Sequence, residues 1–143
     1  MALKIPVAGI EGFHALAAEH EHKEYDTLIL QNAFGNQLYY YHVNRTTKEI
    51  KNGCVHHTLL YDTLKLVPDT PLVLLGNGYD LYNQQLSSFE KRHTIVNNSS
   101  TSYFPSITFL GSWGYEQIMN GSLELTDQAI MPLYLKNPDF FSK

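Results

Sequence analysis

"TLILQNAFGNQLYYYHVN", residues 27–44, decides the predicted fold, because it holds two β-rich segments separated by a turn signal. Residues 27–32 contain the apolar run of residues 28–30. Residues 37–44 are rich in tyrosine and have side chains that alternate between two faces. Gly35 and Asn36 lie between them and readily adopt the positive φ angles of a tight turn. The stretch therefore predicts an antiparallel β-hairpin.

Further short stretches have the composition of strands. They are residues 54–67, the apolar run 72–76, residues 93–98, and residues 103–111 with Pro105 near the start. Two stretches predict short helices, residues 12–20 and residues 80–92. The pattern predicts a mainly β fold, an antiparallel sandwich or barrel of about seven to eight short strands with one or two short helices. Residues 1–10 are expected to form an extended N-terminal arm, and residues 11–143 a single β-rich domain.

The composition excludes several classes of protein. The net charge is −4, which is unfavourable for broad nucleic-acid binding, and only 17% of the residues are charged. Cys54 is the single cysteine, so an intrachain disulfide and a thiolate-rich zinc site are both excluded. No signal-like or membrane-spanning apolar run occurs. We therefore expect no membrane partner, and a protein located in the cytoplasm of the producing cell or in a virion.

Two adjacent histidines mark "CVHHTLLYDT", residues 54–63. On a strand, His56 and Thr58 would point to the same face. Downstream, "YFPSITFLG" (103–111) contains Ser106 and Thr108 at the same two-residue spacing. An imidazole serves as a general base or acid, and a hydroxyl binds a phosphate oxygen.

These two stretches resemble the 2H phosphoesterase family, whose paired His-x-Thr strands act on a phosphodiester. The resemblance implies phosphodiester binding by His56, Thr58, Ser106 and Thr108. Ser106 stands where the family has its second histidine, so the resemblance implies a degenerate site that binds without turnover.

A metal site is the other chemistry that histidines suggest. His20 and His22 flank Glu21, but this stretch is the most polar of the chain, and a solvated charged segment explains it. No phosphate-cradling glycine loop, nucleophile elbow or zinc-protease motif occurs. We therefore expect neither a metal nor a cofactor, and no motif argues for an enzyme.

Aromatic residues predict a binding surface. Tyr39 and Tyr41 share one face of their strand, and Trp113 and Tyr115 lie in a glycine-bounded turn. The leading hypothesis is a non-enzymatic assembly or binding module that forms homo-oligomers or joins other proteins, as in a capsid or connector of a virus or phage. The alternatives are the phosphodiester-binding protein and a small carbohydrate-binding domain.

Overall fold

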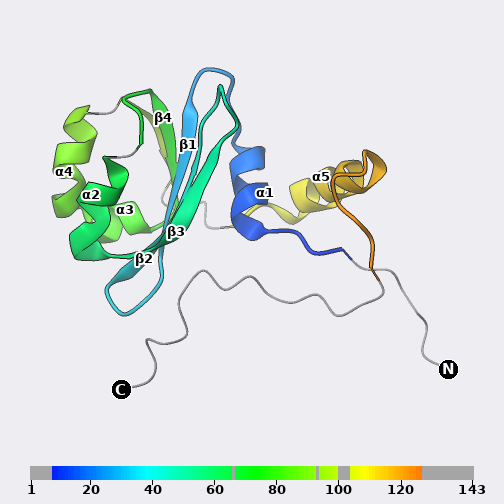
Figure 1. Cartoon of the computed structure of the whole chain (residues 1–143), viewed down its shortest axis with the longest axis horizontal. Helices are drawn as coiled ribbons and strands as arrows, with labels where there is room; N and C mark the ends of the chain where they lie inside the picture. The colour runs from blue at the N-terminus through cyan, green and yellow to red at the C-terminus, as the bar shows by residue number, and fades with distance from the viewer. Residues whose placement is uncertain (1–7, 66, 93, 100–103, 127–143) are drawn as a thin grey trace.

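The computed structural model describes residues 8–65, 67–92, 94–99 and 104–126. Figure 1 shows a sheet with helices on both faces. The elements in chain order are α1 (Gly12–Glu19), β1 (Asp26–Asn32), β2 (Gln37–Val43), β3 (Ile50–His56), the 3-10 helix η1 (His57–Leu59), α2 (Leu60–Leu64), β4 (Leu72–Leu75), α3 (Gly78–Leu81), α4 (Asn83–Arg92), β5 (Ile95–Ser99) and α5 (Ile107–Met119).

The sheet has five strands in the order β3-β2-β1-β4-β5. The predicted hairpin is confirmed: β1 pairs antiparallel with β2, and Leu30 lies opposite Tyr40. β3 continues this antiparallel meander. β4 instead runs parallel to both β1 and β5. β4 is buried along its whole length, as expected for a parallel strand between two covered faces.

The predicted sandwich or barrel is wrong, because the structure is an open mixed α/β sheet with helices packed on it. Two stretches predicted as strands form helices. Residues 57–64 form η1 and α2, and residues 107–111 of the predicted strand 103–111 form the start of α5. η1 and α5 each begin with a side-chain cap, given by His56 and by Ser106 respectively. The predicted helices at residues 12–20 and 80–92 are present as α1 and as α3 followed by α4.

Each face of the sheet has its own hydrophobic core. One core joins leucines of β1 and β4 to α2 and α4, through Leu60, Leu64, Leu86 and Phe89. The other places Leu16 and Ala17 of α1 against the opposite face of the sheet. Figure 1 shows α2, α3 and α4 on one side of the sheet, and α1 with α5 beyond it on the other.

The N-terminal arm falls mostly outside the described residues, which begin at residue 8. Ile10 is half-buried and packs over Gly114 of α5. Within the described part of the chain, no helix is long and apolar enough to cross a membrane.

Candidate functional site

Small side chains bring α1 close to the sheet. Ala15, Leu16 and Ala17 are buried, and Leu16 and Ala17 contact the core that contains Ile29 and Tyr41. Alanine has no side-chain atoms beyond Cβ, so the helix backbone lies near the strands here. Beside this contact, residues of α1 and of the sheet enclose a space.

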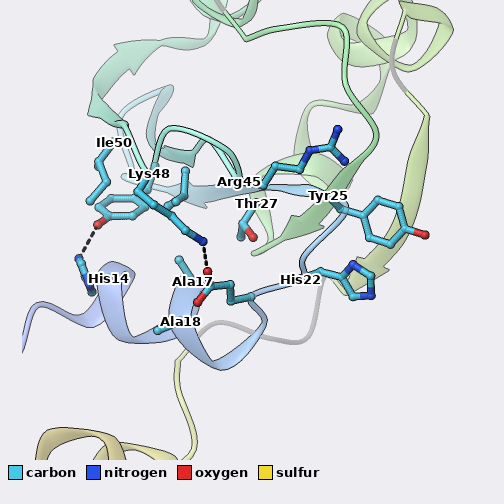
Figure 2. A pocket seen from close by; sticks show the side chains of 12 residues that line it. His14, Ala17, Ala18, His22, Tyr25, Thr27, Arg45, Lys48 and Ile50 are labelled. Carbon is cyan, nitrogen blue, oxygen red and sulfur yellow. Dashed lines mark hydrogen bonds and ion pairs between the residues drawn. The ribbon is translucent and has the colours of Figure 1, made fainter. Parts of the chain in front are cut away.

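We call this space the α1 hollow. It has a volume of about 180 Å³ and lies between α1 and the ends of β2 and β3 (Figure 2). Its floor is largely apolar, formed by Ala17, Ala18, Val43, Ile50 and the ring of Tyr41. The rim is polar, and its residues are His14, Glu21, His22, Tyr25, Thr27, Arg45 and Lys48.

Two cations at the rim come from the connection between β2 and β3. Lys48 forms an ion pair with Glu21, so its charge is neutralised across the opening (Figure 2). Arg45 is anchored by its backbone, whose N–H donates to Asp26 Oδ1 at 3.0 Å. The guanidinium of Arg45 has no ion-pair partner among the described residues. Figure 2 shows the side chain of Arg45 at the edge of the hollow, extending away from α1.

Tyr41 and His14 meet at one end of the hollow, where Tyr41 Oη lies 3.1 Å from His14 Nδ1. Burial, with a smaller contribution from the charge of Glu11, raises the pKa of Tyr41 well above its usual value. Tyr41 is therefore a neutral hydroxyl at any physiological pH. It can orient His14 or a ligand, but it cannot act as a phenolate nucleophile.

His14 also borders a second space, which we call the α5 hollow. Its volume is about 300 Å³, and its lining residues are Gly9, Ile10, Glu11, His14, Trp113, Gln117, Ser122 and Leu123. The rings of His14 and Trp113 lie 5.5 Å apart between centroids. His14 is thus the residue that the two hollows share.

His56 and Thr58 lie close together, but they do not share a strand as the sequence predicts. His56 ends β3 and Thr58 lies in η1. His56 Nδ1 lies 2.9 Å from Thr58 Oγ1 and also accepts from the Thr58 N–H, which makes it the cap of η1. Neither residue lines the α1 hollow or the α5 hollow.

Ser106 and Thr108 do not form the strand pair that the sequence predicts. Ser106 is the N-cap of α5, and Thr108 lies in its first turn. Ser106 bonds to Glu19 at the end of α1 rather than facing His56. A phosphodiester site built from two facing strands is therefore not formed by these residues.

The four predicted aromatic residues lie in different settings. Tyr41 is buried and forms part of the floor of the α1 hollow. Tyr39 is half-buried on the same sheet face and contacts Phe13. Trp113 is half-buried in the α5 hollow, whereas Tyr115 is exposed on α5. Sequence reasoning missed Arg45 and Lys48, although two cations in the polar connection after a predicted hairpin were a signal for them.

Histidines and carboxylates do not gather into a ligand set. In the described ranges, no group of three or more His, Cys, Asp or Glu side chains is placed to hold a metal ion. His22 instead stacks on Tyr25, with ring centroids 4.3 Å apart. His20 forms the C-cap of α1.

No protein-family model and no curated protein matches the chain. Among solved structures, the chain is similar to an uncharacterized protein from Pseudomonas aeruginosa that is described as similar to the peptidase YeaZ. The sequence identity is 16% and the TM-score 0.55, over 92% of this chain and 59% of the neighbour. The chain thus spans less than two thirds of that protein, and the likeness concerns the fold.

This likeness corrects the functional hypothesis. The expected β-rich structural module of a virus is wrong, because the open α/β sheet resembles the YeaZ-like structure and not a viral structural protein.

Proposed function

We propose that this chain is a ligand-binding domain that holds a small organic anion in the α1 hollow. The observation that carries the proposal is Arg45, a residue at the edge of the hollow whose guanidinium has no ion-pair partner among the described residues. A guanidinium binds a carboxylate or phosphate through two parallel hydrogen bonds, and it keeps its charge at every physiological pH.

The electrostatics of the rim favour one anionic group. The chain as a whole carries a net charge of −4, so a positively charged opening is a local property of this site. Lys48 is already paired with Glu21, which leaves Arg45 as the main attraction. His14 and His22 also line the hollow, on opposite sides of it (Figure 2), and either can donate a hydrogen bond to a ligand.

The size of the hollow and its apolar floor indicate the size and polarity of the part of the ligand that is not the anionic group. A water molecule occupies about 30 Å³ in the liquid, so about 180 Å³ corresponds to about six water molecules, which is room for a small organic ligand. The alanines, Val43 and Ile50 offer apolar contacts and no hydrogen-bonding side-chain groups. A short carboxylic acid with an aliphatic or aromatic body, such as benzoate, has this combination.

The chemistry at the hollow supports binding rather than turnover. The high pKa of Tyr41 keeps its hydroxyl protonated, and the hydroxyl is engaged by His14. The pair that most resembles a base beside a hydroxyl nucleophile, His56 and Thr58, lies outside both hollows and caps a helix.

Isothermal titration with benzoate tests the proposal. We expect Arg45→Gln to weaken binding at least about tenfold, because a charge-assisted hydrogen bond is lost. Lys65→Gln is the matched control, since Lys65 pairs with Asp62 on the opposite side of the sheet. Equal affinity for the wild type and Arg45→Gln, or an equal loss in Lys65→Gln, would refute a specific site at Arg45.

A further inference from the structure

α5 has two faces with different environments. Its inner face is covered by the chain itself: Gly114 is buried, and a Cβ there would lie 2.8 Å from Ile10 Cδ1. Trp113, on the same side, contacts His14. The outer side carries large apolar residues that remain exposed, so contacts among the described residues leave this part of the helix uncovered.

The outer face forms a continuous apolar stripe. Ile107, Tyr115 and Met119 are 88%, 64% and 68% exposed, and Phe104 just before the helix is 80% exposed. Ile107, Gly111, Tyr115 and Met119 follow one another at intervals of four residues, which places them along one side of the helix. We call these five residues, with Phe104 included, the α5 stripe.

From this stripe, we propose that two copies of the chain associate by packing their α5 helices against each other. Four large apolar side chains that are mostly exposed present roughly 600 Å² in each copy. A stable protein interface buries about 800 Å² per partner, so the stripe supplies most of what a dimer needs. Apolar stripes of this size on soluble proteins usually mark an interaction site.

Gly111 favours a second copy of α5 as the occupant. A Cβ built at Gly111 meets nothing within 4 Å, so no described part of the same chain requires a glycine there. Glycine inside a helix is unfavourable by about 1 kcal/mol relative to alanine. At the centre of the stripe, however, it lets two helix backbones approach closely. An antiparallel pair crossing at Gly111 would place Ile107 of each copy near the Tyr115 end of the other.

The distribution of charge on α5 also favours a second copy of the chain as the partner. Glu116 is the only charged residue in α5, and it is not part of the stripe. Two copies with a net charge of −4 each repel one another, and an uncharged contact face keeps this repulsion small. A basic partner protein would instead be expected to face acidic residues, which the stripe does not contain.

Sedimentation velocity of the full chain, from about 1 to about 100 μM, tests the proposal. We expect a concentration-dependent species of twice the 16.3 kDa chain mass. Tyr115→Asp should weaken dimerisation by about thirtyfold or more. Tyr61→Asp is the control, because Tyr61 is also an exposed helical tyrosine but lies on α2.

Gly111→Ala separates dimerisation from folding. In an isolated helix this change is stabilising, so circular dichroism should show an equal or higher melting temperature for the monomer. The same variant should dimerise more weakly, because the added methyl group lies at the crossing. A wild-type chain that stays at 16.3 kDa, or a dimer unaffected by both Tyr115→Asp and Gly111→Ala, would overturn the proposal.

Discussion

The carboxylate of Glu19 accepts two hydrogen bonds from Ser106, one from the backbone N–H at 2.9 Å and one from the hydroxyl at 2.6 Å. These residues are 87 positions apart in the chain, and the contact joins the end of α1 to the start of α5. The partial burial of Glu19 acts to raise its pKa, but the two bonds from Ser106, with the charge of His20, outweigh it and lower the pKa. The ionised form of Glu19 therefore holds the two helices together.

Glu19→Gln should destabilise the protein in a pH-dependent way. Because the pKa of Glu19 in the folded state lies below its usual value of 4.5, its contribution is present above that pH and is lost as the pH falls through the lowered pKa. We expect urea unfolding to show a deficit for Glu19→Gln at neutral pH that shrinks in acid. A deficit independent of pH would contradict this role.

Ser106→Ala should cost about 1 kcal/mol of unfolding free energy, because it removes the N-cap of α5. The Ser106 hydroxyl accepts from the Phe109 N–H at 3.2 Å, and alanine cannot replace this bond. Ser87→Ala is the control: Ser87 lies within α4, and its hydroxyl donates to the Gln84 carbonyl oxygen. Chemical denaturation should show a clearly smaller change for Ser87→Ala, and equal losses would argue against the cap.

Asp26→Ala should cost about 3 kcal/mol or more, because it removes the centre of a buried polar cluster. The carboxylate of Asp26 is fully buried and accepts from His42 Nε2, the Thr70 hydroxyl and the Arg45 N–H, each at 3.0 Å. Asp62→Ala removes an exposed carboxylate that pairs with Lys65 and should cost less than about 1 kcal/mol. Similar costs for the two variants would show that the Asp26 cluster is not a structural anchor.

Gly76→Ala should be strongly destabilising, because Gly76 follows β4 with a φ of +87°, and an added Cβ would lie 2.3 Å from the Leu30 carbonyl oxygen. Gly12→Ala is the control: a Cβ at Gly12, in α1, meets nothing within 4 Å. Thermal unfolding should show a large fall in melting temperature for Gly76→Ala and none for Gly12→Ala. A tolerated Gly76→Ala would mean that β4 and β1 do not lie this close.

The strands that form local pairs could be predicted from the sequence. The β1–β2 hairpin has a turn signal between two short β-rich segments, and the apolar run of β4 has the pattern of a buried strand. The parallel pairing of β4 with β1 could not be predicted in this way, because it joins segments separated by β2, β3 and α2.

The two wrongly predicted strands have a physical explanation. α5 has apolar residues around most of its circumference, so neither a helical nor a strand period stands out in its sequence. In the other stretch, the imidazole of His56 accepts from the Thr58 N–H and so ends the strand where the sequence alone suggests that it continues. A histidine is not among the usual capping residues, so the sequence gives little warning of this change.

The site was only partly predictable. The sequence predicts Tyr41 and Trp113 as aromatic binding residues; they line the α1 hollow and the α5 hollow, and ligand binding by either stays a prediction. The proposed role of Arg45 has no signal in the sequence pattern, because it depends on the packing of α1 beside the end of β2. No pattern in the sequence indicates that these two segments, α1 and the end of β2, pack beside each other.

Glu21→Gln should raise the affinity for an organic anion, in contrast to Arg45→Gln. Glu21 neutralises Lys48 across the α1 hollow, so removing its charge frees a second cation. We expect benzoate to bind at least a few-fold more tightly in titration calorimetry. Glu49→Gln removes an acidic charge from the same chain connection outside the hollow and should have a smaller effect. A weaker affinity in Glu21→Gln would contradict the assigned electrostatics.

The most direct test of the central claim is a heteronuclear NMR titration of the labelled protein with benzoate. Binding in the α1 hollow predicts saturable shifts concentrated at Ala17, Ala18, Val43 and Ile50, with little change in α2 and α4 on the opposite face of the sheet. It also predicts that these shifts disappear in Arg45→Gln while the rest of the spectrum is preserved. Shifts that are absent, unsaturable or centred elsewhere in the protein would contradict the claim that this hollow is an anion-binding site.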